Sequence, residues 1–279
     1  MHVALVTWQE LPGLSDDDQE LLGPLRELGV EATAAVWNDP GVRWGEFDAV
    51  VIRSTWDYYR RIAEFRSWID RVGAGDRLWN PAGVVRWNSH KSYLRDLEDR
   101  GVPIIPTRFC PDLASAARAL EEEGWDRAVL KPAVSAAAYR THVITPDSIA
   151  DGSDRWKEVA AAGELLLQPY QDEVERSGER SLVFFWGNYS HTYLRAPRLA
   201  RSSTLIEGTA YEPREDEIRV ARLALACAPG RTLYGRVDLL PDEQGRMRVM
   251  ELEVIEPRLG LSSSPGSAQR FAEAIRDAV

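Results

Sequence analysis

The sequence has little cysteine: Cys110 and Cys227 are the only two among 279 residues. Two cysteines cannot build the disulfide framework of a small secreted domain, so we expect a reducing, cytoplasmic compartment. No apolar run approaches the roughly 18 residues that a membrane-spanning helix needs, and we expect no membrane partner. The short apolar run at the N-terminus has no lysine or arginine before it and predicts a first strand, not a signal peptide.

Positive charge is also scarce, with 34 lysines and arginines against 44 acidic residues and a net charge of −10. Such a chain is poorly suited to non-specific nucleic-acid binding, although a small anionic ligand needs only a few local cations. Hydrophobic residues at 44% and charged residues at 28% exclude a disordered or low-complexity chain. The length exceeds that of one typical domain.

Several common functional motifs are missing. The four histidines have neither metal-ligand spacing among themselves nor a suitable spacing to the cysteines. No G-x-G-x-x-G follows the first strand, and neither G-x-x-x-x-G-K-[ST] nor G-x-S-x-G occurs. Dehydrogenase, P-loop and serine-hydrolase functions therefore lose their usual support.

The chain does contain alternating strand and helix signals. In the first third, strands are predicted at 2–8, 30–37 and 47–53, with helices at 15–28 and 58–72, an order typical of an open, mostly parallel sheet. Further on, helices are predicted at 90–100 (begun by Ser89), 114–123, 148–162, 215–226 and 268–279. The remaining strands are predicted at 127–130, 142–144, 164–168, 180–186, 190–194, 232–240 and 246–255.

The last two strands form a hairpin that gathers carboxylates. Alternation places Asp238, Glu251 and Glu253 on one face of the pair, together with Arg236. Such a group repels itself unless a cation lies among its members, and hard oxygen ligands suit Mg²⁺ bound with nucleotide phosphates. The alternative is an ordinary solvated outer face.

Two registers of this hairpin remain open. In the first, Leu240 pairs with Met247, and Glu251 then lies opposite Arg236. In the second, the partner strand is shifted by two residues, and Glu251 lies opposite Asp238. Directly opposite Cβ atoms would be about 5 Å apart in either register.

The hairpin motifs resemble those of the ATP-grasp superfamily, the fold of D-alanine–D-alanine ligase, glutathione synthetase and RimK-type ligases. Gly235-Arg-Val-Asp238 is similar to the family's G-R-[IV]-D, and Met250-Glu-Leu-Glu253 to its metal-binding E-x-N. The resemblance covers roughly residues 88–260. It implies that Asp238, Glu251 and Glu253 bind Mg²⁺, with Glu253 replacing the usual asparagine and Glu256 in reserve, and that Arg236 contacts the transferring phosphoryl group.

Two lysines fit the same resemblance. Lys91 lies in a segment, 89–107, similar to the family's K-x-x-x-x-x-L-x-x-x-G-[IV]-P-x-P, with one additional residue between Pro103 and Pro106. Lys131 ends a strand before a loop of small residues. The resemblance implies that both contact phosphate groups of ATP; the alternative is that they are solvated surface residues. The loop 133–140 carries Ser135 and alanines where the family has glycines, and its N–H groups would cap phosphates.

Further nucleotide contacts are implied along the chain. The segment 165–170 resembles the strand that receives adenine, and the segment 178–180 resembles one whose acid lies near the ribose; ordinary core packing is the alternative for the tyrosine. Two arginines fall where glutathione-synthetase-like members hold the phosphorylated intermediate, and we favour the first. The implied residues are Gln168, Pro169, Tyr170 and Glu179 for the nucleotide and Arg195, then Arg198, for the intermediate.

A substrate site is predicted after the third strand, where open α/β sheets place their ligand crevice. Arg53 could bind a carboxylate and Asp57 an amino group, with Ser54 and Thr55 beside them; helix capping is the alternative. The stretches R-S-T-W-D-Y, W-N-P and E-L-E-V-I-E-P resemble the ATP-grasp group around O-ureido-D-serine cyclo-ligase, the enzyme that closes the cycloserine ring.

The resemblance implies an ATP-grasp fold of class α/β with an α+β lid. We expect a Rossmann-like N-terminal domain at 1–88, a lid at 89–171 and a catalytic domain at 172–279. The implied activity is an ATP- and Mg²⁺-dependent ligase that joins a small amino-acid-like carboxylate to an amine-type nitrogen through an acylphosphate. Ligation within one molecule and between two molecules are both left open. A carboxylate kinase and a regulatory nucleotide-binding module remain alternatives, and a homo-oligomer is left open.

Overall fold

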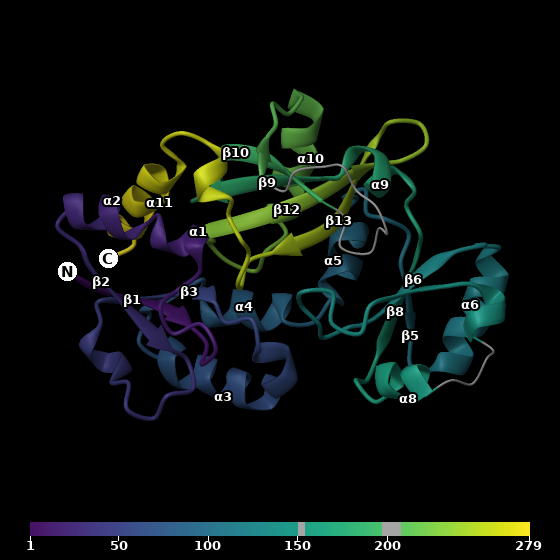
Figure 1. The fold of residues 1–279 in the computed structure, drawn as a ribbon, viewed down its shortest axis with the longest axis horizontal. Helices are drawn as coiled ribbons and strands as arrows, with labels where there is room; N and C mark the ends of the chain where they lie inside the picture. The colour runs from purple at the N-terminus through teal and green to yellow at the C-terminus, as the bar shows by residue number, and fades with distance from the viewer. Residues whose placement is uncertain (150–153, 197–207) are drawn as a thin grey trace.

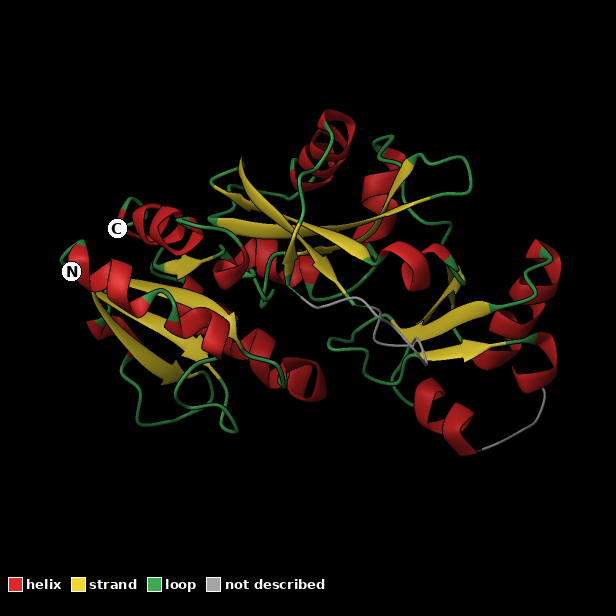
Figure 2. Cartoon of the chain, turned by 45° about the horizontal axis from the view of Figure 1, so that its top comes forward, coloured by secondary structure: helices red, strands yellow, loops and turns green. Residues whose placement is uncertain are grey.

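The computed structural model describes residues 1–149, 154–196 and 208–279, and it arranges their strands in three sheets (Figures 1 and 2). The first sheet lies at the left of Figure 1, with both chain termini beside it, and the second lies at the right. The third sheet lies between and above them. The predicted mixture of helices and strands is confirmed.

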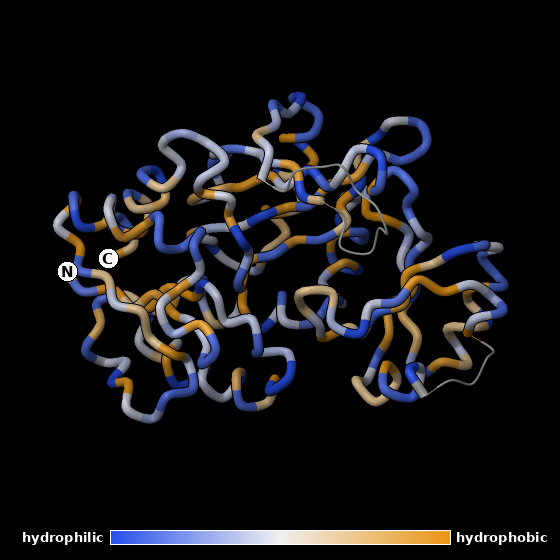
Figure 3. The backbone as a smooth tube through the Cα atoms, viewed as in Figure 1, coloured by the Kyte–Doolittle hydropathy of each residue, from blue (hydrophilic) through white to orange (hydrophobic). Residues whose placement is uncertain are grey.

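The first sheet is parallel, as predicted, and both of its faces are covered. Val3 and Leu5 of the central strand pack in one apolar cluster, and Ala4 and Val6 pack in another. The strand order is β2 (Glu31–Val36), β1 (His2–Thr7), β3 (Ala49–Ser54) and β4 (Leu78–Trp79), with α2 (Leu22–Glu27) and α11 (Ser267–Arg276) on one face and α3 (Ile62–Gly73) on the other. β1 and β3, which are covered on both faces, are apolar over most of their length, and the tube at their position in Figure 3 is largely orange.

The predicted helix 15–28 is divided into α1 (Asp16–Gln19) and α2. Ser15, where the helix was predicted to begin, caps α1, because its side chain accepts a hydrogen bond from the N–H of Asp18. Pro24 lies in the first turn of α2, where its missing N–H leaves no hydrogen bond unmade. The short helices η1 (Trp44–Glu46) and η2 (Tyr58–Arg61) complete this region, η2 directly preceding α3.

The second sheet is antiparallel, with three helices packed against it. Its apolar cluster includes Leu120, Leu130, Trp156 and Leu167. The strand order is β5 (Arg108–Cys110), β8 (Leu165–Pro169), β6 (Ala128–Pro132) and β7 (His142–Ile144), and the helices are α6 (Leu113–Glu123), α7 (Pro146–Ile149) and α8 (Asp154–Ala160). The four residues between α7 and α8 lie outside the described part of the chain.

The third sheet is also antiparallel and has one apolar and one mixed face. Leu182 and Phe184 pack toward helices on the apolar face, whereas Val183 and Phe185 point to the other side. That second face is apolar where α11 covers it and becomes polar toward Ser181. The strand order is β11 (Thr209–Ala210), β10 (Asn188–Arg195), β9 (Glu179–Phe185), β12 (Tyr234–Pro241) and β13 (Met247–Glu253), and the helices on the apolar face are α4 (Ala82–Asn88), α5 (Tyr93–Asp99) and α10 (Glu215–Leu225). Two further elements flank this sheet, α9 (Glu173–Ser177) and η3 (Leu261–Ser263).

The prediction that Ser89 begins a helix is wrong. Ser89 instead ends α4, its N–H donating to the carbonyl of Val85, and α5 begins only after Ser92. Lys91 therefore lies in the turn between two helices, where its own N–H donates to the carbonyl of Ala133 (2.8 Å).

Two buried asparagines join the first part of the chain to the third sheet. The Asn80 amide donates to the carbonyls of Tyr234 (2.9 Å) and Val254 (2.7 Å). The Asn88 amide donates to the carbonyl of Leu252, and its oxygen accepts from the N–H of Val254. Because Asn80 directly follows β4, its hydrogen bonds fix the first sheet relative to the third, and Asn88 attaches the end of α4 to the same part of the third sheet.

Candidate active site

A cavity of about 450 Å³ lies where the three sheets meet. The loops after β1 and β3 contribute aromatic side chains to it, among them Trp8, Trp56 and Tyr58. The second sheet contributes Lys131 from the end of β6 and Gln168 from β8. Its floor is the polar face of the third sheet, formed by β9, β12 and β13.

The hairpin β12–β13 has the second predicted register at the carboxylates. Asp238 lies opposite Glu251, and Arg236 lies opposite Glu253. An irregularity after Asp238 then changes the pairing, so that Leu240 lies opposite Arg248 and matches neither predicted register. The irregularity leaves the predicted clustering intact: carboxylate oxygens of Asp238, Glu251 and Glu253 lie within 4.8 Å of one another.

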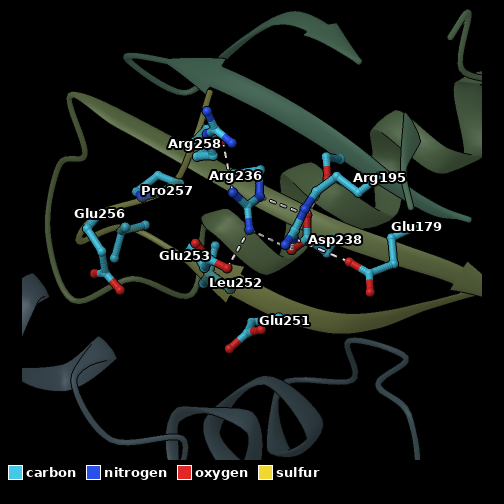
Figure 4. Close-up of polar contacts among 12 residues, drawn as sticks. Glu179, Arg195, Arg236, Asp238, Glu251, Leu252, Glu253, Glu256, Pro257 and Arg258 are labelled. Carbon is cyan, nitrogen blue, oxygen red and sulfur yellow. Dashed lines mark hydrogen bonds and ion pairs between the residues drawn. The ribbon is translucent and has the colours of Figure 1, made fainter. Parts of the chain in front are cut away.

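Two arginines surround the buried Asp238 (Figure 4). Its Oδ1 accepts hydrogen bonds from Ser181 Oγ (2.6 Å) and Arg236 Nε (2.9 Å), and its Oδ2 accepts one from Arg195 Nη1 (2.8 Å). Burial alone would raise the pKa of Asp238, but the two guanidinium charges outweigh it and lower that pKa. Arg236 also contacts Glu253, so one guanidinium links two of the three carboxylates.

Glu251 forms an ion pair with Lys91. Burial opposes ionisation of this carboxyl, yet the charges of Lys91 and Lys131 outweigh burial and hold the pKa of Glu251 at about 2. The carboxylate is thus ionised and available to a cation at neutral pH. Glu253 has the opposite balance, because burial and the neighbouring carboxylates raise its pKa.

Lys131 is 9% exposed, and within the described residues it has no carboxylate within ion-pair distance. Burial therefore lowers the pKa of this ammonium to about 8, with Lys91 adding repulsion. A buried cation at the cavity wall without a counter-ion is suited to an anionic ligand such as a phosphate group.

The residues predicted to hold the nucleotide are brought together. Gln168, Pro169, Tyr170 and Glu179 all line the cavity, and burial raises the pKa of Glu179 to about 7. Gln168 Nε2 donates to Thr107 Oγ1 (2.9 Å), which fixes its side chain. The sequence did not single out the apolar residues that share this part of the cavity, Ile105, Val129, Leu240 and Met250.

The loop after β6 contributes Ser135, which is buried at the cavity and donates to the carbonyl of Pro132 (3.0 Å). Ala137 and Ala138 follow with φ of 52° and 60°, the left-handed conformation that glycine adopts most easily. Alanines here therefore take the backbone shape that the glycines of the resembled loop would favour, at a cost of about 1–2 kcal/mol each. Both alanines line the cavity.

The predicted substrate residues lie elsewhere. Arg53 is 1% exposed, its Nε donating to Asp18 Oδ1 (2.8 Å) and its Nη2 to the carbonyl of Pro257 (2.8 Å). Ser54 also donates to Asp18, and Asp57 accepts from the Trp37 indole. Neither these three residues nor Thr55 lines the cavity.

Their neighbours Trp56, Tyr58, Tyr59 and Arg60 face the cavity instead. Asp18, which is remote in sequence, binds Arg53 on the side of the turn that faces away from the cavity. This contact determines that the neighbouring residues face the cavity instead. No local pattern could have revealed that partner.

Of the two arginines predicted to hold the intermediate, Arg195 lines the cavity and pairs with Glu179 (3.3 Å) as well as with Asp238. Arg198 lies outside the described residues. Two cavity residues, Glu256 and Arg258, follow β13. Glu256 was considered only as a reserve metal ligand, and it is not part of the three-carboxylate group.

Three clustered carboxylates, a buried lysine pair and an apolar recess beside a strand from a second sheet define the class: this is the site of an ATP-grasp enzyme. The oxygen-only donor set of Asp238, Glu251 and Glu253 fits Mg²⁺. Within the described residues, no helix is long and apolar enough to cross a membrane.

Comparisons with known proteins support this assignment to the ATP-grasp enzymes. Residues 3–80 match the family model of the D-cycloserine synthetase DcsG N-terminal domain. The cycloserine biosynthesis protein DcsG of Streptomyces lavendulae is 34% identical over 294 residues, covering 99% of this chain and 98% of the relative. The crystal structure of D-cycloserine synthetase DcsG superposes with a TM-score of 0.91 at 32% identity over all of both chains.

The chain therefore belongs to the DcsG family of ATP-grasp ligases. A more distant structure shares the fold: D-alanine–D-alanine ligase from Bacillus anthracis superposes with a TM-score of 0.67 at 15% identity, covering 100% of this chain and 97% of that one. The ATP-grasp fold and the ATP-dependent ligase activity toward a small substrate, both predicted from the sequence, are confirmed.

Proposed function

We propose that this ligase closes a ring within one small amino-acid derivative of the O-ureido-D-serine type. One observation carries the proposal: the carboxylates, lysines and arginines expected to bind ATP line the same cavity as the aromatic side chains of the N-terminal part. Beside the aromatic rings, this cavity also carries charges of both signs, from Arg60, Glu256 and Arg258, which suits a small zwitterionic molecule. The family relative named for D-cycloserine synthesis supports the same substrate class.

The first step would transfer the γ-phosphoryl group of ATP to the substrate carboxylate. A carboxylate oxygen attacks the γ-phosphorus, the bond to the β–γ bridging oxygen breaks, and ADP leaves with that electron pair. Lys131, Lys91 and Arg236 line the cavity and would stabilise the charge on the phosphate groups, the largest expected contribution to such a reaction. Asp238, Glu251 and Glu253 would hold Mg²⁺, which neutralises phosphate charge when bound.

The second step would form the ring. A nitrogen of the same molecule attacks the acylphosphate carbon, phosphate leaves with the electron pair of the C–O bond, and the nitrogen loses a proton. Arg195 and Arg236, which both line the cavity, would bind the departing phosphate. Since acylphosphates hydrolyse readily, the cavity must exclude water during both steps. We place the reaction in the cytoplasm, where ATP is supplied and where both buried cysteines would stay free.

Trapping tests the acylphosphate directly. With ATP, Mg²⁺ and an amino-acid-type carboxylate, hydroxylamine should divert the intermediate to a hydroxamate while ADP is released. ADP release without a carboxylate, or none with any carboxylate, would contradict the proposal. Continued ADP release with no nitrogen acceptor available would instead identify a carboxylate kinase.

A further inference from the structure

Glu256 occupies an unusual position at the cavity. It follows β13, is 7% exposed and lines the cavity beside Trp56 and Tyr58. Figure 4 shows its side chain apart from the group formed by Arg236, Asp238 and Glu253. Within the described residues its carboxylate has neither a hydrogen bond nor an ion pair.

The backbone around Glu256 is held firmly. The Trp56 indole donates to the carbonyl of Glu256 (3.1 Å), and Arg53 donates to that of Pro257 (2.8 Å). Arg236 donates to the carbonyl of Arg258 (2.9 Å). The carboxylate is therefore presented from a fixed segment, as a ligand-binding group requires.

The two cationic side chains that act on Glu256 are already paired with other carboxylates, so a further cation could bind to it. Lys91 and Arg236 act on it from a distance, but each is already paired, with Glu251 and with Asp238 and Glu253 respectively. Burial and the charge of Glu253 raise the pKa of Glu256 well above its ordinary range. A buried carboxyl without a cationic partner is unfavourable, and a cationic ligand group would offset this cost.

We propose that Glu256 binds the α-ammonium group of the substrate. This inference rests on the proposed function and adds the orientation of the molecule: the ammonium lies at Glu256 while the carboxylate faces Arg236 and the three-carboxylate group. Holding the α-amino group as an ammonium also removes its lone pair. An ammonium is not nucleophilic, so the α-amino group cannot couple with the acylphosphate of a second substrate molecule.

The test compares two probes by calorimetry, in the presence of Mg²⁺ and a non-hydrolysable ATP analogue. One probe is O-ureido-D-serine, and the other is its analogue without the α-amino group. The wild type should prefer the amino probe by about 10- to 100-fold, the range expected for a hydrogen bond to a charged group. Glu256→Gln should lose this preference, and Glu243→Gln, a matched loss of charge on the exposed β12–β13 turn, should retain it.

A Glu256→Gln protein that keeps the preference, or a wild type that shows none, would overturn the inference. If Glu256→Gln fails to fold, Glu256→Asp replaces it: this variant keeps the charge but shortens the side chain, and the preference should fall without vanishing. An unchanged preference in Glu256→Asp would equally overturn the inference. ADP release by the wild type is scored separately, so an ammonium preference without turnover would refute ring closure and leave the Glu256 site standing.

Discussion

At the scale of single residues, the two lysines of the cavity differ in what they already contact. Lys91 is paired with Glu251, so that this carboxylate remains ionised. Lys131 lacks a carboxylate partner among the described residues and is buried at the end of β6. We therefore expect Lys91 to hold the proposed metal ligand Glu251 in place and Lys131 to bind the nucleotide.

Glu251→Gln should abolish ATP turnover while leaving the fold intact. A neutral amide is a weaker Mg²⁺ ligand than a carboxylate, and it also leaves Lys91 without its counter-ion. Substrate-dependent ADP release and circular dichroism measure the two effects, with Glu243→Gln as the charge-matched control on the turn of the same hairpin. ADP release near the wild-type rate from a folded Glu251→Gln protein would remove the hairpin from the catalytic centre.

The affinity for Mg-ATP should fall as the pH rises through about 8. The pKa of Lys131 is lowered to about 8 by burial, so the lysine is charged below this pH and neutral above it. Phosphate favours the charged form, and binding should therefore take up a proton near pH 8.5, visible by calorimetry in buffers of different ionisation enthalpy.

Lys131→Arg provides the control for this titration, because a guanidinium stays charged over the whole range. Its affinity should not fall between pH 7 and 9.5. Identical pH profiles for the wild type and Lys131→Arg would show that another group controls binding. Lys131→Ala should weaken binding by about 1.5–3 kcal/mol at pH 7, and Lys91→Ala should also weaken it.

At the scale of elements, the C-terminal end of β3 supports the site from behind. Arg53 links α1, through Asp18, to the segment after β13, through the carbonyl of Pro257. Its guanidinium also lies over the Tyr234 ring, 4.9 Å from the centroid. The strand end thus acts on the substrate wall indirectly, by fixing the segment that carries Glu256 and Arg258.

Arg53→Ala should lower the free energy of unfolding by about 3–5 kcal/mol, because it leaves Asp18 buried without its cation. Arg61→Ala removes an exposed ion pair with Glu64 and should change the same quantity by less than about 1 kcal/mol. Urea denaturation of both variants checks the contrast. Equal stability losses would mean that the Arg53–Asp18 pair has no special structural weight.

Contacts between segments that are close in the sequence could be predicted better than contacts between distant segments. The β12–β13 hairpin could be predicted because the alternation of side chains and a short turn determine which residues share a face. The alternation left two registers open. Ser89 was misassigned because serine is typical of the start of a helix, whereas here its N–H donates to the carbonyl of Val85 and its Oγ to that of Arg86, which ends the preceding helix. The roles of Arg53 and Glu256 both depend on the hydrogen bond from Arg53 to the carbonyl of Pro257, which joins segments about two hundred residues apart. No local sequence pattern encodes such a contact.

At the scale of the whole molecule, each of the three sheets supplies a different part of the cavity. The third sheet supplies the carboxylates, the second supplies Lys131 and Gln168, and the loops after the strands of the first sheet supply the aromatic wall. Asn80 and Asn88 fix the first and third sheets together through β12 and β13. The aromatic wall and the carboxylate floor of the cavity therefore keep a fixed position relative to each other, as a substrate that contacts both requires.

The central claim is that both reacting groups belong to one molecule, and mass spectrometry of the product tests it most directly. Purified protein is incubated with ATP, Mg²⁺ and O-ureido-D-serine as the sole substrate, and ADP is quantified alongside the product. The account predicts a cyclic product formed from a single substrate molecule, with one ADP released per ring. A product whose mass contains two substrate molecules, or ADP release only after a separate amine is added, would contradict it.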